Sequence, residues 1–565
     1  MKLNLKLAMI GVVAILGFAA TRAHSQVVIS GSSALYLEAG QASYAAQGCA
    51  WTTSSKIFTL TDHRSGSGGS VNVTDTGTAW ITWTPSTPGN CSTIVANTEV
   101  VYVSTDSTVG NRCFFARPQC TLTTTATANQ AGNNQLPGVG DSALPAAAIT
   151  DISGQPTTVS ATDIRPEDAA FATERALTGC GFPVAGSKYL GLGYTSGSQI
   201  NGSTFQSAGG GSSFNVANFA LTGNDPYTGT ATPSSWTVTP VGATSAVVFV
   251  NPGNATGFGS LLAFNIDRAV LAGFLDGTYG RPQDLFPQGF SSTGTSGSVV
   301  YIREPLSGTF NTVEYAIPNS VEGLTSQEVG QASLSTITTG NLYPAFNCTN
   351  TTPSTTNTWL ASQNPLNEKD SRGSNFSYRE RAIGTGNEVK AVLATPDSLG
   401  YAFWSGANFS AATASTAKYL TVDGIDPIQE TWSDGVVPTS GNGLLGNVTL
   451  SHVKDGTYPI WTLLRLVSLP GTPGATVASN LAKAALNFLS PHQPDFVPVD
   501  QLLVVRSHFS PPGVAYPGNA GTPANGSGSS AESGGDVGGL VLTLQSEGDY
   551  NLDNGVQTGS TGLRQ

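Results

Sequence analysis

The sequence predicts an α/β fold built on parallel strands. Apolar, β-branched stretches alternate along the chain with segments of helical periodicity, and turns rich in Gly, Pro and Ser separate them. The length of 565 residues is enough for more than one lobe with a sizeable core. Charged residues make up 11% of the chain and hydrophobic residues 39%, which is unlike a disordered polyelectrolyte or a membrane protein.

Residues 1–25 have the features of a secretory signal peptide. Lys2 and Lys6 give it a positive start, an apolar run extends from Met9 to Ala20, and small residues precede the expected cleavage site. No cysteine follows the apolar run, so a bacterial lipid anchor is not expected. No second apolar run is long enough to span a bilayer. The mature protein is therefore expected to be soluble and either periplasmic or secreted.

The net charge and the number of cysteines limit the classes of function that the sequence allows. A formal net charge of -12 argues against nucleic-acid binding, which needs a basic face. Six cysteines, an even number in an oxidising compartment, indicate disulfides. The close pair Cys113 and Cys120 is the first expected bridge, followed by Cys49 with Cys91. Zinc binding is the competing interpretation, but no Cys-x-x-Cys pair or histidine cluster accompanies these cysteines.

In the first part of the mature chain, the sequence predicts a strand, a helix and a second strand that runs into a glycine-rich turn. Ser32 or Ser33 is the expected cap of the helix. A later strand leads through a turn at Asp163 into a helix that begins at Pro166. Residues of about 86–155 are rich in Thr, Asn, Gly and Pro, and we expect an insertion of loops and short strands there. The ordered segments are 27–29, 34–47, 56–70 and 159–177.

The second part of the chain continues the alternation after another Gly/Ser-rich stretch at about 178–240. A buried strand, an amphipathic helix with turn signals after it, and then a second helix that begins near Thr309 are expected first. A helix, turn and strand, then a strand and a long helix follow, and one more strand is possible in the Gly-rich tail. These segments are 245–253, 261–286, 301–317, 386–409, 458–469, 474–490 and 538–545.

The stretch from Tyr301 to Ile317 concentrates groups that suit an anion. Arg303 stands four residues before Ser307-Gly308-Thr309, where a helix is expected to begin. A helix N-terminus offers free N–H groups and a positive dipole end, and Gly308 lets the backbone approach an anion closely. The two hydroxyls and the guanidinium add hydrogen-bond donors. The alternative interpretation is an ordinary helix cap beside a surface arginine.

Three earlier turns accompany this stretch in a particular order. They read Gly-Ser-Ser at 31–33, Ser-Gly-Ser-Gly-Gly at 65–69 and Ala-Thr-Asp at 161–163. Together with Arg-Glu-Pro-Leu-Ser-Gly-Thr at 303–309, they resemble the motifs of the periplasmic phosphate-binding proteins that serve ABC importers. Those proteins belong to the two-lobed solute-binding superfamily. The ordered set is more specific than any one of its members.

The resemblance implies a two-lobed, periplasmic-binding-protein-like α/β fold, in which each lobe is a sheet flanked by helices and the ligand cleft lies between the lobes. Lobe 1 would combine residues 26–248, with loop-rich insertions at about 86–155 and 178–240, with residues 458–565, which end in a Gly-rich tail. Lobe 2 would span residues 249–457. The implied function is capture of phosphate, or a similar tetrahedral oxyanion, by a monomer that delivers it to a membrane ABC permease. No metal or cofactor is implied.

The resemblance also implies a set of ligand-binding residues. Asp163 would accept a hydrogen bond from a protonated oxyanion and disfavour sulfate, which has no proton to donate. A shift of one residue in the glycine-rich turn would select Ser65, and Pro305 stands where the family often has a second Asp, which puts fine selectivity in doubt. Loss of the Arg303 side chain is expected to weaken binding but to leave the fold almost unchanged. The full set is Ser33, Ala34, Ser67, Asp163, Arg303, Ser307, Gly308 and Thr309.

Two other function classes stay open. Asp141-Ser142-Ala143 is similar to the nucleophile turn of alkaline phosphatases, so a secreted phosphoester hydrolase is one alternative. Such enzymes need a metal cluster, whereas the histidines of the mature chain are scattered, so no catalytic residue and no enzyme activity are predicted. A surface structural or adhesive protein is the other alternative, because it would suit the Gly/Ser/Thr/Asn-rich loops.

Overall fold

The computed structural model describes 20 stretches of the chain, and the account that follows is confined to them. They are residues 25–46, 56–62, 76–83, 98–124, 153–164, 166–177, 217–220, 236–253, 257–276, 279–285, 297–303, 306–317, 327, 368–369, 376–382, 385–406, 408–431, 434–489, 495–507 and 537–540.

Three parallel strands form the centre of the first lobe. β1 (Ser25–Gly31) lies between β4 (Thr98–Ser104) and β6 (Thr157–Thr162). The β-branched runs of β1 and β4 are buried on both faces, as is usual for parallel strands with helices on each side. A hairpin of β2 (Lys56–Asp62) and β3 (Thr76–Trp83) pairs antiparallel with β4 and extends this edge of the sheet.

The position of β4 corrects one expectation from the sequence. Residues of about 86–155 were predicted to be a loop-rich insertion, but residues 98–104 form this central strand and residues 107–115 form helix α3. The Thr, Ser and Asn residues of the segment suggested loops. The run Val100 to Val103 is nevertheless completely buried beside β1, because burial on both faces favours a continuous apolar strand.

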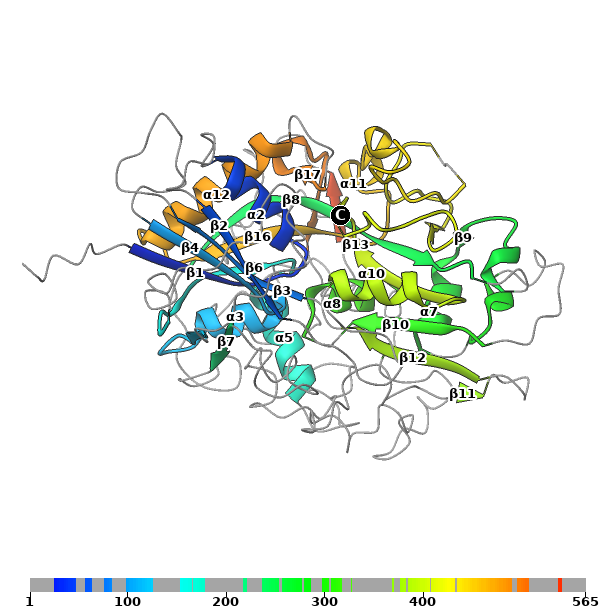
Figure 1. The fold of residues 1–565 in the computed structure, drawn as a ribbon, viewed down its shortest axis with the longest axis horizontal. Coiled ribbons are helices and arrows are strands. Elements are labelled where there is room, and N and C mark those ends of the chain that lie inside the picture. The colour runs from blue at the N-terminus through cyan, green and yellow to red at the C-terminus, as the bar shows by residue number, and fades with distance from the viewer. Residues whose placement is uncertain are drawn as a thin grey trace, which may run out of the picture.

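Helices cover both faces of the first lobe (Figure 1). α2 (Tyr36–Ala46) and α12 (Pro473–Leu489) pack together on one face, where Ile29, Tyr102, Leu466 and Leu481 belong to one buried core. α3 (Ser107–Phe115) and α5 (Pro166–Leu177) pack against each other on the opposite face. The predicted helices at 34–47, 166–177 and 474–490 are confirmed with ends shifted by a few residues.

The second lobe repeats this plan. β10 (Val299–Arg303) runs parallel to β12 (Phe376–Ala382) and β13 (Ser398–Phe403), and the short strand β11 (Glu368–Lys369) pairs with β12. The helices are α7 (Arg268–Asp276), α8 (Gly308–Ala316) and α10 (Thr385–Ala394). Two buried cores lie in this lobe and around the strands that join it to the first. The two-lobed α/β architecture predicted from the sequence is therefore confirmed.

One long strand joins the two lobes. The first part of β8 (Thr237–Val250) pairs with β16 (Trp461–Ser468) of the first lobe, up to the partners Ser245 and Trp461. From Ala246 onward β8 pairs with β13 of the second lobe. β16 in turn pairs with β6, so the main sheet runs without a break from β11 to β2. The lobe limits given in the sequence analysis remain predictions.

The remaining elements are short. β9 (Asn265–Ile266) pairs with β15 (Thr421–Val422), β5 (Thr121–Thr124) with β7 (Ala217–Ala220), and β18 (Val504–Ser507) with β19 (Val537–Leu540). β14 (Lys418–Tyr419) and β17 (Val497–Pro498) pair with β8, and α11 (Ser451–Lys454) precedes β16. Among the helices that the structure describes, none combines the length and apolar character that crossing a membrane requires.

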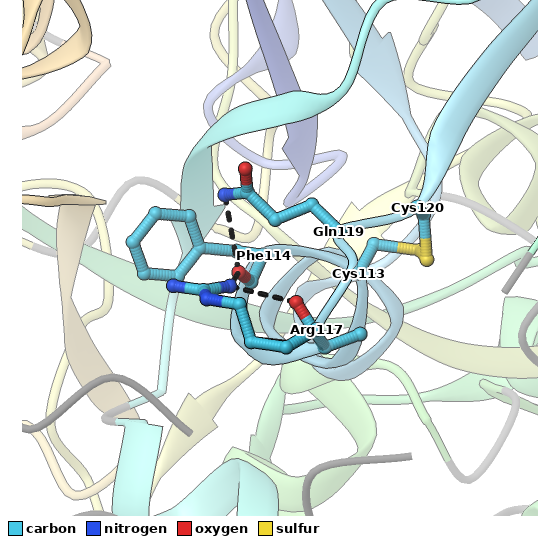
Figure 2. Close-up of a disulfide and its surroundings, with 6 residues drawn as sticks. Cys113, Phe114, Arg117, Gln119 and Cys120 are labelled. Atoms are coloured by element: carbon cyan, nitrogen blue, oxygen red, sulfur yellow. Dashed lines mark hydrogen bonds between the residues drawn. A yellow bond between two sulfur atoms is a disulfide. The ribbon is translucent and has the colours of Figure 1, made fainter. Parts of the chain in front are cut away.

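A disulfide links the last turn of α3 to the segment that follows the helix (Figure 2). It joins Cys113 and Cys120, whose Cα atoms are 4.7 Å apart, which confirms the first expected bridge. Arg117 Nη1 donates to the carbonyl oxygens of Phe114 and Ala116 at 2.7 Å, so it satisfies backbone acceptors at the end of the helix. Cys49 and Cys91 lie outside the described residues, and their pairing stays a prediction.

Candidate functional site

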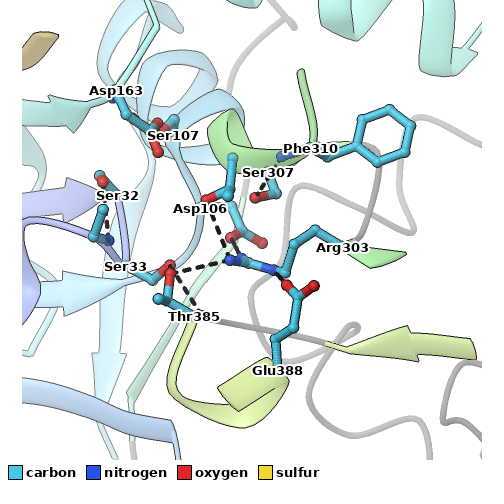
Figure 3. A network of polar contacts seen from close by, with 12 residues as sticks. Ser32, Ser33, Asp106, Ser107, Asp163, Arg303, Ser307, Phe310, Thr385 and Glu388 are labelled. Atoms are coloured by element: carbon cyan, nitrogen blue, oxygen red, sulfur yellow. Dashed lines mark hydrogen bonds and ion pairs between the residues drawn. The ribbon is translucent and has the colours of Figure 1, made fainter. Parts of the chain in front are cut away.

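The candidate site lies where the two lobes meet at the carboxyl ends of their parallel strands. β1 leads into α2, β4 into α3, and β6 into Asp163 and α5, while β10 leads into α8 and β12 into α10. Since β1, β4 and β6 are parallel, and β10 and β12 are parallel, each lobe presents helix N-termini at one edge of its sheet. Ligands of α/β sheets usually bind at such an edge. Figure 3 shows side chains of these turns converging.

Arg303 lies at the centre of this network. It is the last residue of β10 and its side chain is completely buried. Its Nη1 lies 3.3 Å from Thr309 Oγ1 and 3.1 Å from Thr385 Oγ1, and its Nη2 lies 3.0 Å from Asp106 Oδ1 (Figure 3). Its Nε is 3.9 Å from the Glu388 carboxylate. The alternative interpretation is therefore wrong in placing this arginine on the surface.

The N-terminus of α8 faces Asp163 of the other lobe. Ser307 is the N-cap of α8, and its Oγ accepts from the backbone N–H of Phe310 at 3.4 Å. A Cβ placed on Gly308 would lie 1.7 Å from Asp163 Oδ1 and 2.7 Å from Ser107 Oγ, so no other residue fits there without movement. Gly308 thus allows the backbone of one lobe to approach the carboxylate of the other.

Asp163 is buried and fixed by the first lobe. Ser107 Oγ donates a hydrogen bond to Asp163 Oδ1 and also accepts from the Asp163 backbone N–H at 3.2 Å. Thr462 of β16 donates to the Asp163 carbonyl oxygen at 2.5 Å. The carboxylate is therefore held between α3 and the N-terminus of α8. This position is suitable for accepting a hydrogen bond from a bound group.

Ser33 and Ala34, the ligand residues expected in the turn after β1, lie at the same edge of the sheet. Both already form hydrogen bonds within the protein. Of the two serines expected to cap the helix, Ser32 holds the turn that leads into α2, because its Oγ accepts from the N–H groups of Ala34 at 3.1 Å and Leu35 at 3.4 Å. Ser33 Oγ lies 3.0 Å from Thr385 Oγ1 of the other lobe. Ser33 is thus brought to the arginine network, and the N–H of Ala34 points at Ser32.

Several hydrogen bonds between described residues join the lobes at the site, and three of them come from different turns or strand ends. They are Asp106 to Arg303, Ser33 to Thr385, and the Thr108 backbone N–H to the Leu306 carbonyl oxygen at 3.2 Å. Each links a turn of the first lobe to a turn of the second. The structure therefore shows the lobes in direct contact around Arg303.

Sequence reasoning missed five residues of this network. They are Asp106, Ser107, Thr108, Thr385 and Glu388. One signal for the first three was present, because a β-branched run followed by Ser-Thr-Asp-Ser-Thr is typical of a strand that leads into a capped helix. The Thr-x-x-Glu pattern of Thr385 and Glu388 is typical of a helix start, but it does not reveal their partners, which lie far away along the chain.

Two buried tyrosines lie beside the network, and their phenol groups stay neutral. Burial raises the pKa of Tyr401 well above its ordinary value, and the Glu388 carboxylate raises it further. The neutral phenol accepts from the Arg303 backbone N–H at 3.0 Å and donates to Gln327 Oε1 at 2.5 Å. Burial, followed by Asp163, raises the pKa of Tyr102, which donates to the Ser32 carbonyl oxygen at 2.5 Å. Both phenols therefore hold turns of the site in place.

Several predicted residues lie outside the residues that the structure describes. Ser67 and its alternative Ser65 are among them, and so is Pro305, on which the doubt about selectivity rested. The similarity of Asp141-Ser142-Ala143 to a nucleophile turn also falls there. Within the described part, the carboxylates next to Arg303 include those of Asp106 and Glu388.

No family model and no curated protein matches the chain. Similar solved structures include PstS from Borrelia burgdorferi, with 10% identity and a TM-score of 0.28 over 82% of this chain and 92% of that one. A possible phosphate binding protein from Planctomyces limnophilus DSM 3776 has 10% identity and a TM-score of 0.27, covering 82% and 87% of the two chains. An ABC-type phosphate transport receptor from Vibrio cholerae has 14% identity and a TM-score of 0.25, covering 46% and 72%. At these low TM-scores the likeness carries no inference about function.

Proposed function

We propose that this protein is an extracytoplasmic solute-binding protein that captures phosphate, or a similar tetrahedral oxyanion, for an ABC importer. One observation carries the proposal. A completely buried arginine, Arg303, lies among helix N-termini that come from both lobes. Guanidinium groups and helix N-termini both favour oxyanions, and burial strengthens their electrostatic interaction.

The contacts support a division of roles among the residues. Arg303 and Thr309 would donate to the anion from the second lobe, together with the backbone N–H groups that follow Ser307 and Gly308. Ser33 and the turn at Ala34 would contribute from the first lobe, and Ser107 joins them because it lies between Asp163 and Gly308. Ser67 remains a predicted ligand residue.

Asp163 would set the selectivity of the site. A buried carboxylate that faces a bound anion is repulsive unless a proton lies between them. Hydrogen phosphate carries such a proton at neutral pH, and sulfate does not. A site with this carboxylate therefore favours phosphate and arsenate over sulfate.

Calorimetric titration of the mature protein, purified from its native compartment and dialysed, tests the proposal. Phosphate and arsenate should bind with a saturable heat and raise the melting temperature, whereas sulfate should compete weakly. Turnover of a phosphoester substrate would favour the hydrolase alternative instead. If none of these oxyanions binds at millimolar concentration, the proposal is wrong.

A further inference from the structure

Asp106 has a backbone conformation that aspartate rarely adopts. It is the residue before α3, with φ 85° and ψ 147°, a region populated almost only by glycine. The other non-glycine residues with positive φ in the described ranges lie between 49° and 56°. Hydrogen bonds from its own N–H to the Gly31 carbonyl oxygen and from Gly110 N–H to its carbonyl oxygen hold it there. Strain of this kind is concentrated at functional sites.

The Asp106 side chain does not cap the helix that it precedes. An aspartate at a helix N-cap normally accepts a hydrogen bond from the first turn of its own helix. Every residue of α3 is described, and Asp106 makes no such bond with it. Its carboxylate instead reaches the other lobe, where Oδ1 lies 3.0 Å from Arg303 Nη2.

This ion pair holds one side of the guanidinium, while Thr309 and Thr385 hold the other. Nη1 of Arg303 contacts the two hydroxyls of the second lobe, and Nη2 contacts the carboxylate of the first lobe. The side chain of Arg303 is 0% exposed and that of Asp106 is 7% exposed, so water screens their attraction little. Because the partners belong to different lobes, the pair can form only when the lobes meet.

We propose that Asp106 is a positioning residue that orients Arg303 from the facing lobe and couples lobe closure to anion binding. This inference rests on the proposed function. Asp106 acts through Arg303, and the carboxylates of Glu388 and Asp163 remain in the site when Asp106 is changed. Loss of the carboxylate should therefore weaken binding by lowering the population of the closed, ligand-competent arrangement.

Two substitutions separate the carboxylate from the backbone. Asp106→Asn and Asp106→Gly both remove the charge, but only glycine relieves the strained φ. Both should weaken phosphate binding in calorimetry by about tenfold or more. Without ligand, Asp106→Gly should melt about 2 °C higher than Asp106→Asn. Asp434→Gly is the matched control, since Asp434 is an exposed residue with φ 56° outside the site, and it should leave phosphate affinity unchanged.

A double-substitution cycle tests whether Asp106 acts through Arg303. In an Arg303→Met background, adding Asp106→Asn should change phosphate affinity by less than about twofold, because the partner is gone. A purely structural role of Asp106 would weaken binding equally in both backgrounds. If Arg303→Met does not fold, phosphate binding by Asp106→Asn and Asp106→Gly at wild-type affinity would still overturn the role of Asp106.

The outcomes distinguish this inference from the proposed function. If the wild type binds no oxyanion, both are wrong. If the wild type binds phosphate and both Asp106 variants bind it equally well, only the role of Asp106 is overturned. Tighter binding by Asp106→Asn would also overturn it, because the carboxylate would then compete with the ligand for Arg303.

Discussion

Arg303 shows how burial changes the expected effect of a substitution. From the sequence, Arg303→Ala should weaken phosphate binding and barely affect the fold. In the structure the side chain is completely buried and contacts Asp106, Glu388 and two threonine hydroxyls. Removing one partner of a buried ion pair leaves the other charge uncompensated, which is strongly destabilising.

We therefore predict that Arg303→Ala lowers both phosphate affinity and stability. The affinity should fall at least about tenfold, and the free energy of unfolding without ligand should fall by about 3 kcal/mol. Calorimetry and urea unfolding measure the two effects. Arg268→Ala is the control, since its ion pair with Asp423 is partly exposed and should contribute less than about 1 kcal/mol. An Arg303 variant with unchanged affinity would show that the guanidinium does not hold the anion.

Asp163 carries the prediction on selectivity. Asp163→Asn keeps an acceptor oxygen but removes the buried negative charge, so some phosphate binding should remain while sulfate binding increases. The ratio of phosphate to sulfate affinity should narrow by about tenfold or more. Competitive calorimetry with both anions measures this ratio. A wild type that binds sulfate as tightly as phosphate would mean that Asp163 does not face the ligand.

At the scale of elements, the first turn of α2 carries a buried carboxyl group, that of Glu38. Burial raises the pKa of Glu38 well above its ordinary value, and the nearby carboxylate of Asp495 raises it further. Asp495 is itself held by the Gly406 backbone N–H at 2.8 Å and by Ser405 Oγ at 3.3 Å. These bonds fix a negative charge where α2 packs, so the folded protein favours the protonated form of Glu38.

This raised pKa predicts a pH-dependent effect of Glu38→Gln. The folded state binds more protons than the unfolded state, so wild-type stability falls as pH rises from the ordinary pKa of a glutamate towards the raised one. In Glu38→Gln the side chain does not titrate, so stability does not fall for this reason as pH rises. The variant should melt higher than the wild type at about pH 7, and the difference should disappear at about pH 4. A variant that melts lower than the wild type at neutral pH would contradict this assignment.

At the scale of the whole molecule, an engineered disulfide between the lobes can test whether the anion enters between them. Ser33 Oγ and Thr385 Oγ1 are 3.0 Å apart and belong to different lobes. Ser33→Cys combined with Thr385→Cys should form a bridge under oxidising conditions and hold the lobes together. Phosphate exchange, measured by stopped flow, should then slow at least about tenfold and recover with a reductant.

The control for this experiment is the wild type treated with the same oxidant and reductant, because a reductant also reaches the bridge between Cys113 and Cys120. Small-angle scattering should show that the oxidised variant stays compact with and without phosphate, while the wild type contracts on adding it. A bridge that forms without slowing exchange would show that the anion does not enter between the lobes.

The sequence by itself determined the local elements and the residues whose roles are local. The helix that begins close to Thr309 and the disulfide between Cys113 and Cys120 follow from patterns and spacing over a few residues. Strand β4 was missed because its Thr- and Ser-rich surroundings suggested loops, although the parallel sheet buries it on both faces.

Only the tertiary structure decided which side chains surround Arg303. Asp106 is 197 residues away from it along the chain, and Ser33 is 352 residues from Thr385. Periodicity reports which face of an element is buried, but hydrogen-bond partners depend on how two lobes close over each other. The burial of Arg303 and the alignment of the helix N-termini arise from that packing, and no local pattern in the sequence specifies them.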